Sequence, residues 1–244
     1  MSVCVWMCVP GGANVMTVHF RDTSGAGVAP ITKRDLTGAG RWSEVYRVLG
    51  KRVFDILFVL AFAPLGLTLV AIAALLTALG GHSPFFLQPR VGRDGKIFKM
   101  LKIRTMVPDA DMRLEAYLAE NPDARREWDE KQKLRNDPRI TPFGNWLRKT
   151  SLDEIPQLWN VLKGEMSIVG PRPMMVEQQP LYPGRAYFKL RPGITGNWQV
   201  SDRNESSFAA RAGFDDYYEA NLGFWMDLDI LARTAGVVLR CTGR

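Results

Sequence analysis

One apolar stretch restricts the fold of this chain more than any other part of its sequence. Residues 53–79 read VFDILFVLAFAPLGLTLVAIAALLTAL, with Asp55 as their only charge. A helix needs about 20 apolar residues to cross the hydrocarbon core of a bilayer. The length and composition of residues 53–79 therefore predict a membrane segment.

Pro64, followed by Gly66, falls near the middle of this segment and argues against a simple crossing. Proline removes a backbone hydrogen bond and bends or breaks a helix. At 1.5 Å per residue, the arm before Pro64 is about 16 Å long and the arm after it about 22 Å. Neither arm alone crosses a hydrocarbon core of about 30 Å. A bent helix is therefore expected.

Both flanks of the segment are basic. The residues concerned are Arg47, Lys51 and Arg52 before it, and Arg90, Arg93, Lys96, Lys99, Lys102 and Arg104 after it. Positive charge favours the cytoplasmic side of a membrane, so a re-entrant helix that enters and leaves through one face satisfies both flanks. On composition alone, a kinked span is an equal alternative, and a buried helix of a soluble core is a third.

Composition limits the chemistry that the rest of the chain can perform. The formal net charge of +7 over 244 residues favours an anionic partner, which is a phosphate compound, a nucleic acid or an anionic membrane face. The cysteines, Cys4, Cys8 and Cys241, have no disulfide or zinc spacing, which favours a reducing compartment. His19 and His82 are too far apart in sequence to favour a catalytic triad or a histidine metal site. Carboxylates and basic side chains are left to carry any catalysis.

Outside the apolar segment, we expect a tail and a mixed domain. Residues 1–40 lack sustained periodicity and predict a poorly ordered tail. Residues 96–106, KIFKMLKIRTM, alternate well enough to predict a strand. Residues 109–133 are charge-rich with helical spacing, which predicts a surface helix pair. Residues 214–239 carry aromatic and aliphatic residues at helical spacing, typical of a helix that packs in a core or lies at an interface.

The stretch SLDEIPQLWNVL contains two adjacent acids, Asp153 and Glu154, at the head of a helical pattern. One interpretation is structural, because Ser151 and Glu154 have the spacing of a capping box and acids favour the first turn of a helix. The other is chemical, because a carboxylate can attack phosphorus or hold a magnesium ion beside phosphate oxygens. Spacing alone favours the structural interpretation.

The basic residues around the acid pair favour the chemical interpretation. Arg148 comes shortly before the pair, and Arg172 follows it between two prolines in VGPRP. Arg191 also adjoins a proline, while Lys102 and Arg104 lie on the segment that leaves the membrane. The planar fork of arginine suits phosphate, and rigid presentation lowers the entropy lost on binding. Together these residues predict a phosphate-transfer site next to a membrane.

Five motifs resemble a known family when they are taken in order. They are KRVFD, FAP, KIFKMLKIRTM, LRKTSLDEIPQLWNVLKGEMSIVGPRP and RPGITGNWQVSDRN, which together extend from about residue 47 to the end of the chain. This series resembles the monotopic polyprenyl-phosphate phosphoglycosyl transferases of bacteria. These enzymes initiate the assembly of exopolysaccharide, capsule, O-antigen and glycoproteins.

The resemblance implies a reaction. The family transfers a sugar phosphate from a UDP-sugar to undecaprenyl phosphate, with release of UMP. By similarity, Asp153 would attack the β-phosphate and form an aspartyl-phosphosugar intermediate, which the lipid phosphate would then capture. Glu154 would assist, and the two carboxylates would hold Mg²⁺. Seven further side chains would contact the substrates: Lys102, Arg104, Arg148, Arg172, Arg191, Gln199 and Arg203.

The resemblance also implies a fold and a location. We expect an α-rich α+β monotopic membrane protein, with a re-entrant helical hairpin at residues 41–82 that is broken at Pro64. Residues 83–244 would form a compact catalytic domain with amphipathic interfacial helices on the cytoplasmic face of the bacterial inner membrane. Its partners would be the UDP-sugar, undecaprenyl phosphate and membrane lipids, without nucleic acid, and a homo-oligomer is allowed.

Two residues depart from the family pattern. Ala63 stands where serine commonly precedes the proline of the hairpin, and Asp202 stands where glycine is usual. Within the family, the exopolysaccharide enzymes that transfer glucose or galactose phosphate are the closest in pattern. Two rivals stay open on the residues alone. One is a membrane-associated phosphohydrolase, and the other is a non-catalytic basic scaffold on the membrane.

Overall fold

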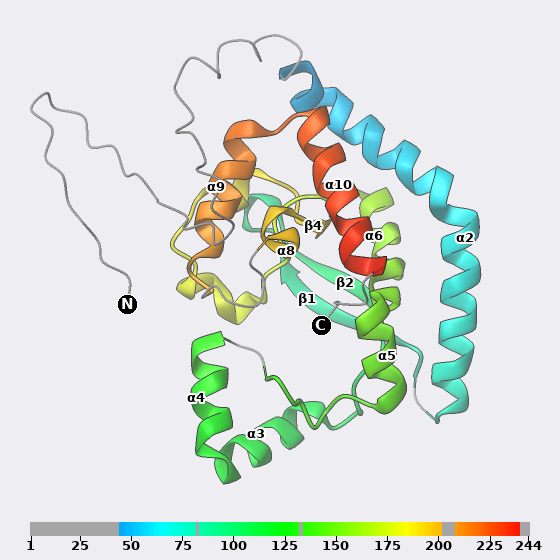
Figure 1. The fold of residues 1–244 in the computed structure, drawn as a ribbon, viewed down its shortest axis with the longest axis vertical. Coiled ribbons are helices and arrows are strands. Elements are labelled where there is room, and N and C mark those ends of the chain that lie inside the picture. Colours follow the sequence, from blue (N-terminus) through cyan, green and yellow to red (C-terminus); the bar gives the residue numbers. More distant parts are fainter. Residues whose placement is uncertain (1–43, 82, 132–133, 202–207, 240–244) are drawn as a thin grey trace, which may run out of the picture. The chain divides into compact units, whose positions relative to one another are not determined.

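The apolar segment forms one long helix. The computed structural model describes residues 44–81, 83–131, 134–201 and 208–239, so the predicted tail and Arg203 lie outside the described residues. Helix α2 spans Lys51–Leu79, directly after a single π-helical turn, η2, at Tyr46–Gly50. Pro64 lies inside α2, and Figure 1 shows the helix changing direction along its length. The predicted break at Pro64 is therefore a bend in a continuous helix, and the re-entrant path stays a prediction.

Most of the surface of α2 is apolar and exposed. Tyr46–Leu79 is long and apolar enough to cross a membrane, and 17% of its most apolar window is buried. The buried residues of α2 fall on one stripe: Lys51, Asp55, Val59, Gly66, Ala73 and Thr77. Their spacing of four and seven residues is that of one helix face. This face contacts the rest of the protein, and the remaining apolar surface is suited to lipid.

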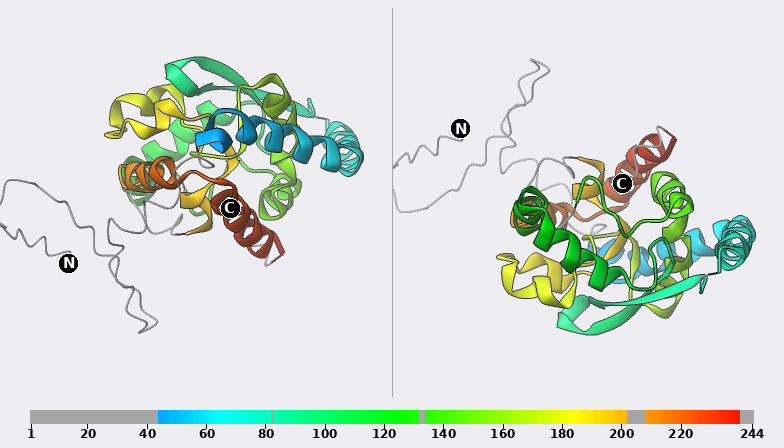
Figure 2. Two further views of the ribbon diagram at one scale, coloured as in Figure 1. Left: turned by 90° about the horizontal axis from the view of Figure 1, so that it is seen from above. Right: turned by 90° about the horizontal axis from the view of Figure 1, so that it is seen from below.

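Two small sheets lie beside this helix. Strands β1 (Phe85–Val91) and β2 (Ile97–Ile103) pair antiparallel, with Phe85 opposite Ile103 and Val91 opposite Ile97. The strand predicted at residues 96–106 is thus confirmed. Strands β3 (Ser167–Val169) and β4 (Gly193–Thr195) pair parallel. In Figure 2 the first half of α2 runs between the β1–β2 hairpin and helix α10 (Phe224–Leu239).

The rest of the described chain is mainly helical, as expected of an α-rich fold. The other helical elements are η3 (Arg93–Gly95), α3 (Ala110–Glu120), α4 (Pro122–Lys131), α5 (Pro142–Thr150), η4 (Leu152–Gln157), α6 (Leu158–Lys163), η5 (Val176–Leu181), α7 (Ala186–Lys189), α8 (Asn197–Val200) and α9 (Arg211–Asn221). Helices α3 and α4 are the predicted surface pair and share a small core of their own around Leu114 and Leu118. The run at residues 214–239 forms two helices, not one, and Trp225 is 77% exposed outside the core.

The main core brings distant segments together against α2. Val59 of α2 packs in one cluster with Met100 of β2, Val161 of α6, Ile168 of β3 and Ile230 of α10. Since the first half of α2 contributes to this core, the helix is an integral part of the domain. Burial of such side chains stabilises the fold by about 1.5–3 kcal/mol each.

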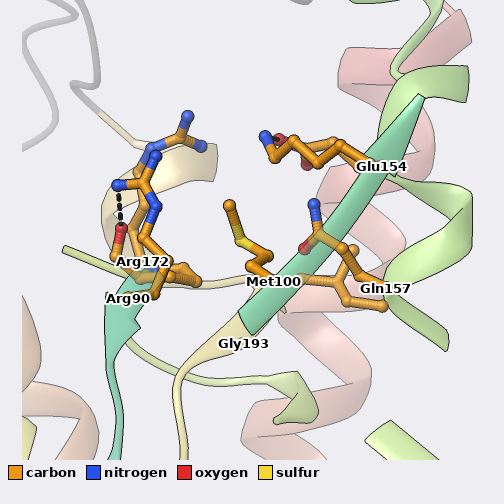
Figure 3. A pocket seen from close by; sticks show the side chains of 9 residues that line it. Arg90, Met100, Glu154, Gln157, Arg172 and Gly193 are labelled. Atoms are coloured by element: carbon orange, nitrogen blue, oxygen red, sulfur yellow. Dashed lines mark hydrogen bonds and ion pairs between the residues drawn. The ribbon is translucent and has the colours of Figure 1, made fainter. Parts of the chain in front are cut away.

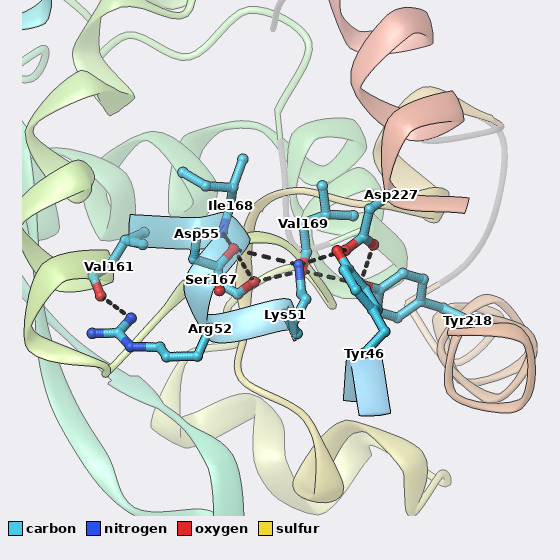
Figure 4. Close-up of polar contacts among 10 residues, drawn as sticks. All are labelled: Tyr46, Lys51, Arg52, Asp55, Val161, Ser167, Ile168, Val169, Tyr218 and Asp227. Atoms are coloured by element: carbon cyan, nitrogen blue, oxygen red, sulfur yellow. Dashed lines mark hydrogen bonds and ion pairs between the residues drawn. The ribbon is translucent and has the colours of Figure 1, made fainter. Parts of the chain in front are cut away.

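Polar contacts add to this attachment of α2 (Figure 4). The side chain of Lys51 lies 2.8 Å from Asp227 of α10 and 3.4 Å from Asp55. Asp55 is fully buried and accepts hydrogen bonds from the Ser167 hydroxyl at 2.9 Å and the Ile168 amide at 3.0 Å. Asp55, the only charged residue of the apolar segment, therefore links α2 to β3 through hydrogen bonds.

Asp227 is the other buried acid of this cluster. It accepts hydrogen bonds from the hydroxyl groups of Tyr46, at 2.6 Å, and Tyr218, at 2.7 Å. Arg52, the next residue after Lys51, donates to the carbonyl groups of Val161 and Leu162 at the end of α6. The start of α2 is thus held to α6 and α10.

Candidate active site

The acid pair lies where two short helical elements meet. Helix α5 begins at a Thr141 cap, whose hydroxyl accepts the Gly144 amide at 2.9 Å. It ends at Ser151, which is left-handed with φ of 58° and turns the chain into the 3₁₀ helix η4. The Ser151 side chain makes no capping hydrogen bond, so the capping-box interpretation is wrong. The α-helix begins only at Leu158, since Pro156 lies within η4 and lacks an amide hydrogen.

Asp153 and Glu154 have different surroundings. Asp153 is 6% exposed and has no hydrogen-bond or ion-pair partner among the described residues. Burial raises the pKa of Asp153 to about 6, although Lys102 and Arg148 act in the opposite direction. Glu154 accepts a hydrogen bond from Lys102 Nζ at 3.0 Å. One acid is therefore held in an ion pair, while the other is a buried carboxyl surrounded by positive charge.

Arg148 reaches this region from the last turn of α5. Its Nε donates to the Thr105 hydroxyl at 2.9 Å. Burial lowers the pKa of Arg148, and the charge of Asp153 is the largest effect in the opposite direction. Gly144 lies one turn earlier on the same face, and a Cβ there would collide with the backbone of Thr105. This close approach brings α5 against the end of β2. The arrangement places Arg148 next to the acid pair.

A pocket lies beside the pair (Figure 3). Glu154 and Gln157 lie on one side of it, and Arg90 and Arg172 lie on the opposite side. The rest of the lining is Met100, Lys102, Pro173, Gly193 and Ile194. Asp153 is a neighbour of this lining but does not belong to it. A small anion in this pocket would meet the paired side chains of Lys102 and Glu154 and the guanidinium groups of Arg90 and Arg172.

The structure brings some predicted site residues to the pocket and places others elsewhere. Lys102, Glu154 and Arg172 line it. Arg104 instead donates to the Ser83 carbonyl at 3.0 Å and lies over the Phe86 ring.

Two more of these residues lie away from the lining. Arg191 donates to the Gly164 carbonyl at 2.9 Å. Gln199 donates to the Ile194 carbonyl at 2.9 Å, and its Oε1 has no partner among the described residues. The predicted substrate contacts of Arg104, Arg191, Gln199 and Arg203 stay predictions.

Two pocket residues were missed from the sequence. Arg90 was counted only as a flanking charge, yet the pairing of β1 with β2 places it on the pocket opposite Glu154. Gln157 is 2% exposed, lines the pocket, and its Nε2 has no partner among the described residues. A weak signal existed for Arg90, because a proline precedes it as one precedes Arg172. Gln157 had none beyond its place three residues after the acid pair.

The apolar helix and the pocket together indicate a class of protein. A long exposed apolar helix is joined to a small domain, whose pocket combines Glu154, Lys102 and two arginines beside the buried carboxyl group of Asp153. This combination is typical of a membrane-associated protein that acts on phosphorylated compounds. The chain belongs to the bacterial sugar transferase family, whose model matches residues 46–241. The family that the motifs predicted is thereby confirmed.

Individual relatives agree with this assignment. A protein of Erwinia amylovora described as a UDP-galactose-lipid carrier transferase is 48% identical over 195 residues, which is 79% of this chain and 41% of the relative. The exopolysaccharide production protein ExoY of Rhizobium meliloti is 45% identical over 201 residues, which is 80% of this chain and 88% of ExoY. The undecaprenyl-phosphate galactose phosphotransferase of Salmonella typhimurium is 44% identical over 195 residues, 79% of this chain and 41% of the relative. The chain thus spans less than half of two of these relatives and most of ExoY.

Proposed function

We propose that this protein transfers a sugar phosphate from a UDP-sugar to undecaprenyl phosphate and releases UMP. The observation that carries the proposal is the buried Asp153 carboxyl beside Arg148 and a pocket that also exposes Arg172. The names of two relatives, an undecaprenyl-phosphate galactose and an undecaprenyl-phosphate glucose phosphotransferase, support this substrate class. Galactose and glucose phosphate are therefore the first groups to test, and the product would enter exopolysaccharide assembly.

The reaction takes place in two balanced steps. In the first, a carboxylate oxygen of Asp153 attacks the β-phosphorus of the UDP-sugar. The bond between that phosphorus and the bridging oxygen breaks, and UMP leaves with the oxygen and its electron pair. In the second, an oxygen of undecaprenyl phosphate attacks the same phosphorus and the bond to Asp153 breaks, which restores the carboxylate. The product is a polyprenyl diphosphosugar.

The neighbours of Asp153 fit these steps. Burial removes water from the Asp153 carboxylate and raises its pKa. Lys102 and Arg148 provide positive charge where negative charge gathers on the transferring phosphoryl group. Glu154 holds Lys102 at 3.0 Å and so keeps that ammonium group at the pocket.

The acid pair is also suited to Mg²⁺. Within the described residues, no group of three or more His, Cys, Asp or Glu side chains gathers at one point. Magnesium in such sites is usually bound through one or two carboxylates together with substrate phosphates, so Asp153 and Glu154 fit this donor set. A bound Mg²⁺ would neutralise the phosphate oxygens of the donor.

A membrane location follows from the acceptor. An acceptor with a polyprenyl chain stays in the bilayer, so the pocket must lie at the membrane surface. The exposed apolar face of α2 supplies the contact with lipid. We place the domain on the cytoplasmic face of the bacterial inner membrane, because UDP-sugars are cytoplasmic and both flanks of α2 are basic.

The test uses the full chain in detergent with UDP-galactose or UDP-glucose, Mg²⁺ and undecaprenyl phosphate. We expect UMP release, and we expect Asp153→Asn to lower its rate about 1,000-fold or more. Asp216→Asn is the matched control, because Asp216 is exposed on α9. Mass spectrometry of protein exposed to donor alone should find the phosphosugar on Asp153 and not on Glu154.

Product analysis separates the rivals. Free sugar phosphate with no lipid-linked sugar would indicate a phosphohydrolase. A protein that neither binds nor consumes UDP-sugars would be a scaffold. Near-normal turnover by Asp153→Asn would exclude the covalent mechanism even if the overall reaction is correct.

A further inference from the structure

One buried side chain of the pocket carries a hydrogen-bond donor that the described residues do not use. Gln157 is the last residue of η4 and is 2% exposed. It lines the pocket together with Lys102 and Glu154, and its Nε2 has no partner among the described residues. A buried amide donor without an acceptor destabilises the fold. Such a donor beside an acid pair therefore calls for an acceptor that arrives with a ligand.

A structural role would be the ordinary explanation of a glutamine at this place. Gln157 directly precedes α6, but its side chain makes no capping hydrogen bond. Asn160, one turn later, shows how the fold satisfies a buried amide. Its Oδ1 accepts the Leu101 amide at 3.0 Å, and its Nδ2 donates to the Lys99 carbonyl at 2.8 Å and to Glu165 at 2.7 Å. Asn160 thus joins α6 to β2, whereas the Nε2 of Gln157 is available to a ligand.

The backbone directs Gln157 to the pocket. Residues three apart in a 3₁₀ helix lie above one another, so Gln157 is on the same side of η4 as Glu154. Met100 and Lys102 share one face of β2, because side chains two apart on a strand point the same way. In Figure 3 the amide group of Gln157 lies between Met100 and Glu154. The free donor therefore belongs to the side of the pocket that carries the acid pair.

The depth of Gln157 indicates which part of a substrate can reach it. Asp153, the nucleophile of the proposed function, is only 6% exposed. The β-phosphoryl group must approach Asp153, so it enters deepest, while the sugar and the nucleoside extend from it toward solvent. Gln157 is buried more deeply than Asp153, so a phosphoryl oxygen reaches it before a sugar hydroxyl does. Phosphoryl oxygens accept hydrogen bonds, and the Nε2 of glutamine only donates them.

We propose that Gln157 is a catalytic residue whose Nε2 donates a hydrogen bond to a non-bridging oxygen of the β-phosphoryl group. The inference rests on the proposed function and adds a neutral donor to it. Negative charge gathers on the non-bridging oxygens while Asp153 attacks the phosphorus and UMP departs. A donor that is already fixed at this place stabilises that charge. No bond to Gln157 forms or breaks, and its amide protons stay on the nitrogen.

Binding measurements with three nucleotides locate the contact. The full chain in lipid nanodiscs is titrated calorimetrically with UMP, UDP and UDP-galactose in the presence of Mg²⁺. Each protein also carries Asp153→Asn, so that no donor is consumed during the titration. Gln157→Met keeps an unbranched side chain of similar length without the donor. One hydrogen bond to a charged acceptor changes affinity about tenfold, so we expect Gln157→Met to weaken UDP and UDP-galactose by about this factor and to leave UMP unchanged.

Turnover provides a second measurement. With Asp153 intact and undecaprenyl phosphate present, Gln157→Met should release UMP about 100-fold more slowly than the wild type. Gln179→Met is the matched control, because Gln179 is an exposed glutamine of η5 that does not line the pocket. It should leave the three affinities and the rate of UMP release unchanged.

Thermal unfolding separates the catalytic role from a structural one. Gln157→Met removes a donor that has no partner and should not lower Tm, whereas Asn160→Leu removes a fully bonded amide and should lower it. A lower Tm for Gln157→Met with unchanged affinities would overturn the proposal in favour of packing. A loss confined to UDP-galactose would place the contact on the sugar, and a loss shared by UMP would place it on the α-phosphate or the nucleoside. Either result would also overturn the proposal.

The proposed reaction and the Gln157 contact fail separately. If UDP binding depends on Gln157 but the wild type forms no lipid-linked sugar, the reaction is wrong and the phosphoryl contact stands. If the wild type turns over and Gln157→Met binds and reacts normally, the reaction stands and the contact is wrong.

Discussion

Asp153 is 6% exposed, and Lys102, Arg148 and Arg172 all act on its ionisation. Burial outweighs their effect and raises the pKa of this carboxyl to about 6. A nucleophilic carboxylate must be ionised, so the rate of UMP release should rise through pH about 6 and level off above it. An ordinary exposed aspartate would give a rise at about pH 4. Initial rates measured across the acidic to neutral range check this prediction.

Glu154→Gln provides the control for this pH profile. The negative charge of Glu154 raises the pKa of Asp153, so its removal should move the inflection toward lower pH. The maximal rate of this variant should also fall, but the pH of the inflection does not depend on the maximal rate. An inflection that stays unmoved would assign the titration to another group.

The same burial makes Asp153 unfavourable for stability. Because the pKa is raised in the folded state, that state binds the proton more tightly than the unfolded state does. The contribution to stability is therefore full at low pH and is lost as pH rises through about 6. We expect Asp153→Asn to have a higher Tm than the wild type at neutral pH while being inactive. The gain should disappear below the ordinary pKa of aspartate, and a lower Tm at neutral pH would contradict the assignment.

At the scale of elements, the sequence patterns predicted those helices and strands that depend mainly on the local order of apolar and polar residues. The apolar run became α2, the alternating run became β2, and the charge-rich stretch became the pair α3–α4. The helix expected over residues 152–162 is half wrong, because a left-handed Ser151 and Pro156 produce a 3₁₀ helix first. This miss depends on backbone conformation that helical spacing does not encode.

Contacts between elements that are distant in the sequence could not be predicted from these local patterns. Arg90 reaches the pocket only because β1 pairs with β2 in one register. Asp227 is completely buried against Lys51 and Tyr218, which nothing in its local sequence indicates. Of the candidate site, the acid pair and Arg172 were predictable from residue type and spacing, whereas Arg90 and Gln157 required the tertiary structure.

Asp227→Ala tests how α10 holds α2. The change leaves the Lys51 ammonium buried without Asp227. The Tyr46 hydroxyl loses its acceptor, and the Tyr218 hydroxyl keeps only the Val169 carbonyl. Breaking a buried pair in this way costs about 3–5 kcal/mol. We expect a clearly lower Tm and faster proteolysis. Asp229→Ala is the matched control, because Asp229 forms only an exposed pair with Arg233 and should change Tm little.

At the scale of the whole molecule, α2 decides which side of a membrane each flank occupies. Both halves of the helix contact the same domain. Val59 packs in the main core, Gly66 faces Ile155 and Leu158 of the acid-pair region, and Ala73 packs with Ile103 and Leu147. With 29 residues, α2 is roughly 44 Å long. A straight crossing would carry its second half through the bilayer and away from a domain on the first side.

A re-entrant course reconciles the apolar surface of α2 with these contacts. We therefore expect reporter tags inserted at residues 40 and 95 to be accessible from the cytoplasm in the same cells. Pro64→Leu restores the missing backbone hydrogen bond and favours a straighter helix, so this variant should move part of the population to opposite sides. Tags that lie on opposite sides in the wild type would establish a true span. The contacts of Ala73 with Ile103 and Leu147 could then not coexist with a domain confined to one face.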